Sequence, residues 1–88
     1  MPTNTQCQSA PATTSAYRIV FEPVTGEWVL RKVNSDGASK VLAAYPTQDA
    51  AVADGRRLCG KMAASGHAVT LVAYDDAGKF AFARLYDR

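Results

Sequence analysis

The sequence predicts an α+β fold with the element order β-β-β-α-β-β, in which one helix covers one face of an antiparallel sheet. Residues 17–45 carry three short segments of alternating apolar and polar side chains, separated by turn-forming residues. Residues 48–65 change to the helical period of 3.6. Residues 68–86 return to alternation, and a further turn divides them in two.

The first two predicted strands form a hairpin. Aromatic and aliphatic residues alternate with other side chains over residues 17–22, YRIVFE. The turn PVTG, residues 23–26, then leads into EWVLRKV, residues 27–33. Because so short a connection joins neighbouring strands, we expect these two to pair antiparallel.

The third predicted strand is SKVLAAY, residues 39–45, which follows the turn NSDG at residues 34–37. Alanine favours strands only weakly, so this segment has the weakest strand pattern of the five. We expect it to extend the first hairpin as a third strand.

The helix is predicted to begin after Thr47 and to run to about Ser65. Thr47 suits the N-cap, and Asp49 places a negative charge at the positive end of the helix dipole. Gly66 suits the left-handed residue that closes a helix. The apolar stripe consists of Ala51, Val52, Gly55, Leu58, Cys59, Met62 and Ala63. Gly55 near its centre predicts a close approach to the sheet, with a large residue such as Trp28 against the backbone.

The last two predicted strands are AVTLVAY, residues 68–74, and KFAFARLY, residues 79–86, joined by the turn DDAG. Simple alternation along the last strand predicts Phe80 and Phe82 on one side. It predicts Ala81, Ala83 and Leu85 on the other side.

The string GRRLCGKM, residues 55–62, resembles a phosphate-binding loop of the form G-x-x-x-x-G-K, but Met62 stands where that loop carries Ser or Thr. The helical period also places the string inside a helix, where backbone N–H groups already donate to carbonyls four residues earlier. A phosphate loop needs free N–H groups ahead of a helix. We therefore expect no nucleotide site here.

The composition indicates one small globular domain, residues 17–88, preceded by a polar tail, residues 1–16. The tail has no charged side chain and little apolar bulk, which predicts disorder. No apolar run is long enough to span a membrane, and the start of the chain lacks the basic and apolar regions of a secretory signal. Cys7 and Cys59 lie in dissimilar segments, which fits a reducing compartment. We therefore expect a cytoplasmic protein with no membrane contact.

No cluster of residues predicts catalysis, a cofactor or a metal site. His67 is the only histidine and follows the helix end, and the two cysteines are far apart in the sequence. Asp75 and Asp76 begin the D-D-x-G turn, which accounts for them as turn residues. We therefore predict that the protein is not an enzyme.

Both alternation classes of the predicted strands contain apolar residues, although one helix can cover only one face of the sheet. The predicted interaction surface consists of Arg18, Val20, Val29, Arg31, Val33, Val72, Tyr74 and Arg84. An exposed apolar face of this kind favours a non-catalytic interaction module that self-associates, as a homodimer, through the second sheet face or an edge strand. Scattered surface valines are also ordinary. A protein partner is another alternative, and so is nucleic acid, contacted by the arginines and by Tyr74.

Three short motifs between Tyr17 and Tyr86 carry a family resemblance. They are GEWVL, with Gly26, Trp28 and Leu30, then TQDAAVADGRRLC at the helix start, and DAGKF in the last hairpin. The chain resembles a family of small bacterial and phage domains catalogued as domain of unknown function 2188, and departs from it at Ala50, where such domains tend to place an acidic residue. The resemblance implies a β-rich α+β fold. It implies no activity and no site residues, because the family has no assigned function.

Overall fold

The structure, a computed structural model, describes residues 15–34 and 36–87 of the 88-residue chain. Within these ranges the elements follow the predicted order β-β-β-α-β-β. They are β1 (Ser15–Glu22), β2 (Glu27–Val33), β3 (Ser39–Tyr45), α1 (Gln48–Ala64), β4 (Val69–Tyr74) and β5 (Phe80–Tyr86). Residues 15 and 16, predicted as the end of the tail, open β1, and the rest of that predicted tail lies outside the described residues.

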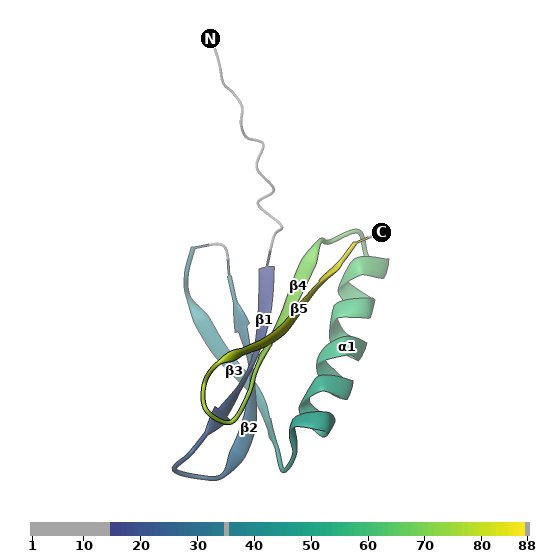
Figure 1. Cartoon of the computed structure of the whole chain (residues 1–88). Helices are drawn as coiled ribbons and strands as arrows, with labels where there is room; N and C mark the ends of the chain where they lie inside the picture. Colours follow the sequence, from purple (N-terminus) through teal and green to yellow (C-terminus); the bar gives the residue numbers. More distant parts are fainter. Residues whose placement is uncertain (1–14, 35, 88) are drawn as a thin grey trace.

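The five strands form one sheet in the order β3-β2-β1-β4-β5, and α1 lies along one side of it (Figure 1). Neighbouring strands pair antiparallel, except that β1 and β4 run parallel. The parallel pair arises because α1 carries the chain back from the end of β3 before β4 begins, and parallel strands need such a long crossover. The predicted α+β fold is confirmed, and the sheet is mostly rather than wholly antiparallel.

Both ends of α1 are capped by local hydrogen bonds. Thr47 has extended backbone angles, and its Oγ1 accepts the N–H of Ala50 at 3.1 Å, as expected of an N-cap. Gly66 has a φ of 91°, and the next N–H, of His67, donates to the carbonyl of Met62 at 3.0 Å. This is the Schellman type of helix end, which needs a left-handed residue at that position. The helix boundaries predicted from the sequence are therefore confirmed.

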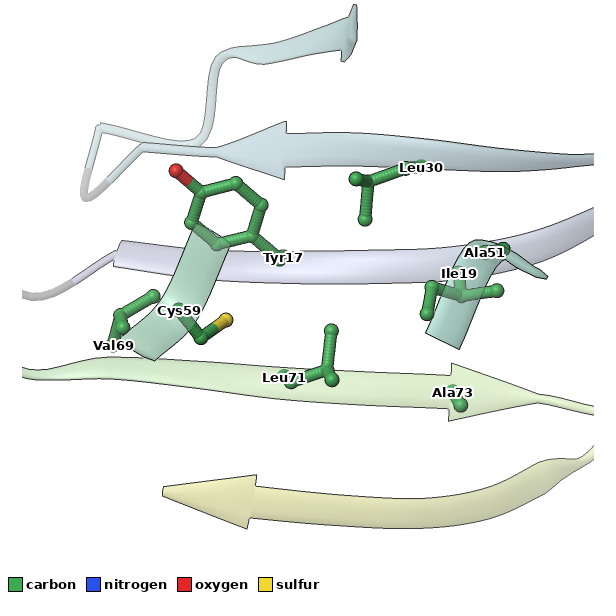
Figure 2. Packing of buried hydrophobic residues seen from close by; sticks show 8 residues of the cluster. All are labelled: Tyr17, Ile19, Leu30, Ala51, Cys59, Val69, Leu71 and Ala73. Atoms are coloured by element: carbon green, nitrogen blue, oxygen red, sulfur yellow. The ribbon is translucent and has the colours of Figure 1, made fainter. Parts of the chain in front are cut away.

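The core lies between α1 and the three central strands of the sheet. Its buried residues are Tyr17, Ile19, Leu30, Ala51, Cys59, Val69, Leu71 and Ala73. Figure 2 shows the side chains of β1, β2 and β4 meeting Cys59 and Ala51 of α1. Burial of one large aliphatic side chain contributes about 1.5–3 kcal/mol, so the core favours this one face of each central strand. The side of the sheet that faces α1 is called the inner face below, and the opposite side is called the outer face.

Gly55 is the point of closest approach between α1 and the sheet. A Cβ atom at this position would lie 3.1 Å from Leu71 Cδ1, 3.4 Å from Ile19 Cδ1 and 3.6 Å from Leu30 Cδ1. The predicted close approach is confirmed, but its predicted partner, Trp28, is wrong. The three aliphatic side chains come from the centre of the sheet, where the helix axis crosses it, so their branched ends occupy the space that Gly55 leaves.

Trp28 instead lies on the inner face beside the core. Its cross-strand partner is Phe21, and the two ring centroids are 5.1 Å apart with the planes tilted by 53°. This tilted arrangement is favourable for aromatic pairs. Trp28 also pairs with Tyr45 of β3, so aromatic side chains extend the inner face toward the β3 edge.

Both edge strands contain an irregularity in their pairing. The register of β3 shifts opposite Leu30 and Arg31, and the register of β5 shifts opposite Ala73 and Tyr74. Phe82 therefore pairs with Ala73, whereas Phe80 pairs with Tyr74. The prediction that Phe80 and Phe82 share one side is wrong, because the extra residue in the bulge reverses the alternation between them.

Candidate interaction surface

The strand register places seven of the eight residues of the predicted interaction surface on the outer face. They are Arg18, Val20, Val29, Arg31, Val33, Val72 and Tyr74. In each strand these residues alternate with residues of the inner face, and residues that pair across neighbouring strands lie on the same face. None of the described residues outside the sheet belongs to an element that packs on this side, since α1 is the one helix described and lies on the other.

Arg84 is the exception, because it lies on the inner face. It pairs with the buried Leu71, and its guanidinium carbon lies 5.1 Å from the centroid of the Tyr86 ring. That distance is within the range of a cation–π contact. Arg84 therefore lies apart from the other two predicted arginines.

The two arginines of the outer face are direct neighbours. Arg18 of β1 pairs with Arg31 of β2 in the antiparallel register. One guanidinium nitrogen of Arg31 donates to Ser39 Oγ at 3.1 Å, and the one ion pair among residues 15–34 and 36–87 involves neither arginine. Like charges placed directly opposite one another on a sheet lower its stability. The pair is thus a basic site without an acidic partner in the described part of the chain.

An acidic pair occupies the end of the same two strands. Glu22 of β1 pairs with Glu27 of β2, and the Val20–Val29 pair lies between this acidic pair and the basic pair. Glu22 Oε1 accepts the N–H of Val24 at 3.3 Å in the adjoining turn. The outer face of the β1–β2 hairpin therefore carries an Arg–Arg pair, an apolar pair and a Glu–Glu pair in succession.

The acidic pair was not among the predicted site residues, although the sequence contains a signal for it. The segment RIVFEPVTGEWVLR, residues 18–31, reads Arg-x-Val-x-Glu in one direction and the same in the other, around the turn at residues 23–26. A hairpin centred on that turn must pair equal residues with one another. Tracing the register through the turn, rather than judging each strand alone, would have found the like-charge pairs.

An apolar row crosses the outer face between the basic and acidic pairs. It consists of Ala44, Val29 and Val20, continued by Tyr74, which follows Ala73, the β4 partner of Ile19, and by Phe80, the partner of Tyr74. Val20, Val29 and Tyr74 are half-buried by their neighbours, and Phe80 at the edge is 64% exposed. On the same face, Val41 lies on the adjacent row opposite Arg31 and is 51% exposed, and Leu85 lies one row further away opposite Thr70 and is 62% exposed. Large apolar side chains are thus accessible at both edges of this face.

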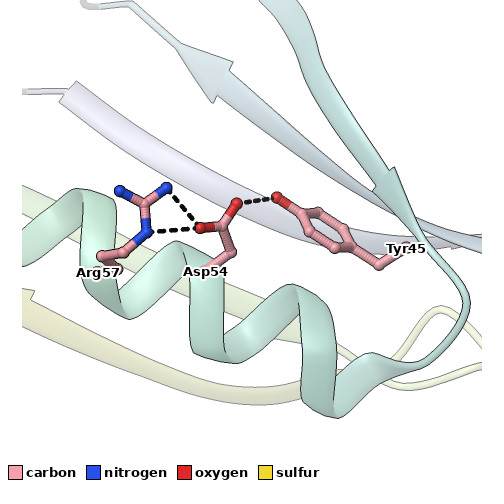
Figure 3. Close-up of polar contacts among 3 residues, drawn as sticks. All are labelled: Tyr45, Asp54 and Arg57. Atoms are coloured by element: carbon pink, nitrogen blue, oxygen red, sulfur yellow. Dashed lines mark hydrogen bonds and ion pairs between the residues drawn. The ribbon is translucent and has the colours of Figure 1, made fainter.

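A polar cluster on the inner side fastens α1 to the β3 edge (Figure 3). The Tyr45 hydroxyl donates to one carboxylate oxygen of Asp54, and Arg57 Nε donates to the other at 2.8 Å. Partial burial and the hydrogen bond to Asp54 raise the pKa of Tyr45 to about 12. The hydrogen bonds from Tyr45 and Arg57 lower the pKa of the Asp54 carboxyl. The Tyr45 hydroxyl and the Arg57 guanidinium thus both donate hydrogen bonds to the Asp54 carboxylate, which indicates a structural role for the cluster.

The other reactive side chains of the described region also make local contacts. Burial raises the pKa of the Cys59 thiol to about 11, which disfavours the nucleophilic thiolate. Asp75 Oδ1 accepts the N–H groups of Ala77 and Lys79 at 2.9 and 2.8 Å, as expected of a turn residue. Residues 15–34 and 36–87 contain no pocket, no group of three or more metal-ligating side chains and no helix long and apolar enough to cross a membrane.

Comparison with known proteins adds no relative to this description. Neither a protein-family model, nor a curated protein, nor a solved structure matches the chain.

Proposed function

We propose that this protein is a small non-catalytic interaction module that self-associates through the outer face of its sheet. The observation that carries the proposal is the apolar row that runs from Ala44 to Phe80 on a face that no described element covers. Burial of such a row against a second copy removes apolar surface from water, which is the main driving force of association.

The outer face suits self-association better than the edge strands do. β3 and β5 form the two edges of the sheet, and each contains a bulge. Bulges are among the features that keep edge strands from pairing with another sheet, because they interrupt the row of free N–H and C=O groups. The pairing of the three central strands is regular from Ala16 to Ile19, so their side chains on the outer face form uninterrupted rows.

The size of the outer face predicts a reversible dimer of moderate affinity. Five strands about 4.8 Å apart and about 20–24 Å long cover about 500 Å² in projection, which is an upper limit on the area that this face can bury. A standard stable interface buries about 800 Å² on each partner. We therefore expect dissociation in the micromolar range of concentration.

Nucleic-acid binding is the second function that one observation favours, namely the unpartnered Arg18–Arg31 pair with Tyr74 on the same face. Two placements favour self-association instead. Arg84 lies on the inner face, and the Glu22–Glu27 pair puts negative charge on the same face as Arg18 and Arg31, which opposes the approach of a phosphate backbone. A nucleic-acid complex would show affinity that falls steeply as salt rises.

The family resemblance remains part of the proposal. We infer that the chain is related to the domains of unknown function 2188 through the Gly26-x-Trp28 motif and the Thr47 helix start, both of which have structural roles in the fold. The proposal includes no reaction, and it retains the expected cytoplasmic location.

The test compares the solution mass of the wild type with that of Val29→Asp, measured by light scattering over a concentration series. Val29 lies in the centre of the apolar row, so a buried carboxylate at this position disfavours association strongly. Ala53→Asp, on the exposed side of α1, adds the same charge away from the sheet and serves as the control. We expect a dimer for wild type and control and a folded monomer for Val29→Asp. A wild-type monomer at every concentration would refute the proposal.

A further inference from the structure

We propose that two copies pack outer face against outer face with their strands antiparallel, so that the Arg18–Arg31 pair of each copy lies over the Glu22–Glu27 pair of the other. This inference rests on the proposed self-association and specifies its geometry. It follows from the order of the paired residues along the β1–β2 hairpin.

The basic and acidic pairs lie at equal distances from the Val20–Val29 pair. Each is two residues away along both strands, which corresponds to about 7 Å. A two-fold axis that crosses the strands at the Val20–Val29 pair therefore exchanges the position of the basic pair with that of the acidic pair. The same axis keeps β1 opposite β1 and β2 opposite β2, so Arg18 faces Glu22 of the second copy and Arg31 faces Glu27.

The other simple two-fold arrangement is electrostatically unfavourable. An axis parallel to the strands would leave each pair at its own height, so that the Arg18–Arg31 pair would face the same pair of the second copy. Four guanidinium groups would then lie together, and the four carboxylates would do the same. Like charges brought together at an interface oppose binding, so the charge pattern selects the crossing axis.

Within one chain the two pairs do not neutralise each other. Arg18 and Glu22 are four residues apart on one strand, about 13 Å along the backbone, and the described residues form no ion pair on this face. That separation exceeds the screening length of about 8 Å at physiological salt. Sheets pack face to face at about 10 Å, a span that an arginine and a glutamate can bridge from opposite sides.

The apolar row coincides with the proposed axis. Val20 and Val29 would each face their own copies across it, and Tyr74 and Phe80 continue the row toward the β5 edge. The interface thus has an apolar centre with a charged row on either side. This is the usual composition of protein interfaces, in which the centre is apolar and the rim is polar.

The test exchanges the charges. One variant carries Arg18→Glu and Arg31→Glu, and the other carries Glu22→Arg and Glu27→Arg. Each alone would place eight like charges in the interface of a homodimer, so we expect dissociation constants at least tenfold higher than the wild type. An equimolar mixture has opposite charges on the two chains and should form a heterodimer with a dissociation constant no higher than that of the wild type. Circular dichroism checks that each variant is folded.

A fourth chain carries all four substitutions and keeps the complementarity with reversed signs, so it should dimerise alone. The inference is overturned if the double variants dimerise as the wild type does, or if their mixture stays monomeric. In either case the proposed function would still hold if the wild type is a dimer and the Val29→Asp variant is a monomer. If the wild type is itself monomeric, or if it binds a mixed-sequence oligonucleotide through Arg18 and Arg31, both proposals fail.

Discussion

Arg18 on β1 lies directly opposite Arg31 on β2, on the uncovered side of the sheet. The two like charges lower the stability of the isolated chain, and the pair becomes favourable only where a negative charge lies close to it. The same two arginines therefore destabilise the monomer and stabilise the proposed dimer.

Arg31→Glu should separate these demands. In the monomer it places a carboxylate opposite Arg18, so a like-charge pair becomes a pair of opposite charges, which should raise the free energy of unfolding by about 0.5–1 kcal/mol. In the dimer it removes the attraction to Glu27 of the second copy, so association should weaken. Urea unfolding at low concentration measures the first effect, and light scattering measures the second. A variant that loses stability and still dimerises like the wild type would contradict the account.

Gly55 and Gly60 form a matched pair for testing the approach of α1 to the sheet. A Cβ at Gly60 meets nothing within 4 Å, so Gly60→Val should not destabilise the protein, because valine favours a helix slightly more than glycine does. A Cβ at Gly55 presses on Leu71 and Ile19, so Gly55→Val should destabilise it by about 1–3 kcal/mol through overpacking. Thermal unfolding of both variants measures the difference. Equal behaviour of the two sites would show that Gly55 is not the contact point.

The Tyr45 hydroxyl should make stability fall in alkaline solution. The pKa of Tyr45 is about 12 in the folded protein, above the ordinary value of 10. Its contribution to the free energy of unfolding is therefore complete below pH 10 and is lost as the pH rises through 12. The raised pKa of Cys59, about 11, begins a similar loss near pH 9. Tyr45→Phe should lower the free energy of unfolding by about 1 kcal/mol at neutral pH and flatten its decline between pH 10 and 12.

Tyr86→Phe is the control for this experiment, because the Tyr86 hydroxyl has no hydrogen-bond partner among the described residues. Tyr86→Phe therefore removes a tyrosine hydroxyl without removing the contact between Tyr45 and Asp54. The assigned role of Tyr45 would be wrong if both phenylalanine variants declined with the same slope.

Phe80 and Phe82 test the bulge in β5, because the register places them on opposite faces. Phe82 packs against the core, so Phe82→Ala should cost about 2–3 kcal/mol of stability. Phe80 is 64% exposed on the outer face, so Phe80→Ala should cost little stability but weaken dimerisation. Denaturant unfolding and light scattering of both variants give the comparison. Similar losses of stability would mean that the two rings share a face.

The local elements were predictable from the sequence because their signals are local. The Thr47 cap, the Gly66 helix end and the alternation within each strand depend on residues a few positions apart. The order of the strands was not predictable, because it depends on where α1 returns the chain to the sheet. The face of Phe80 was missed for a related reason, since one extra residue in a bulge reverses the alternation without changing the sequence pattern.

Most of the candidate surface was also predictable, because alternation assigns Arg18, Val29 and Val72 to one face whatever the strand order. The charge of Arg84 suggests a place beside the arginines of the outer face, but the register places Arg84 opposite Leu71 on the inner face. The Glu22–Glu27 pair required the register through the turn, which is a pairwise property of two strands.

Sedimentation equilibrium of the full-length wild type, from low to high micromolar concentration, tests the central claim most directly. The account predicts that the apparent mass rises from that of one chain to that of two, and that the dissociation constant increases with salt, because charged rows flank an apolar centre. The mass of a single chain at all concentrations, in low and high salt alike, would contradict it.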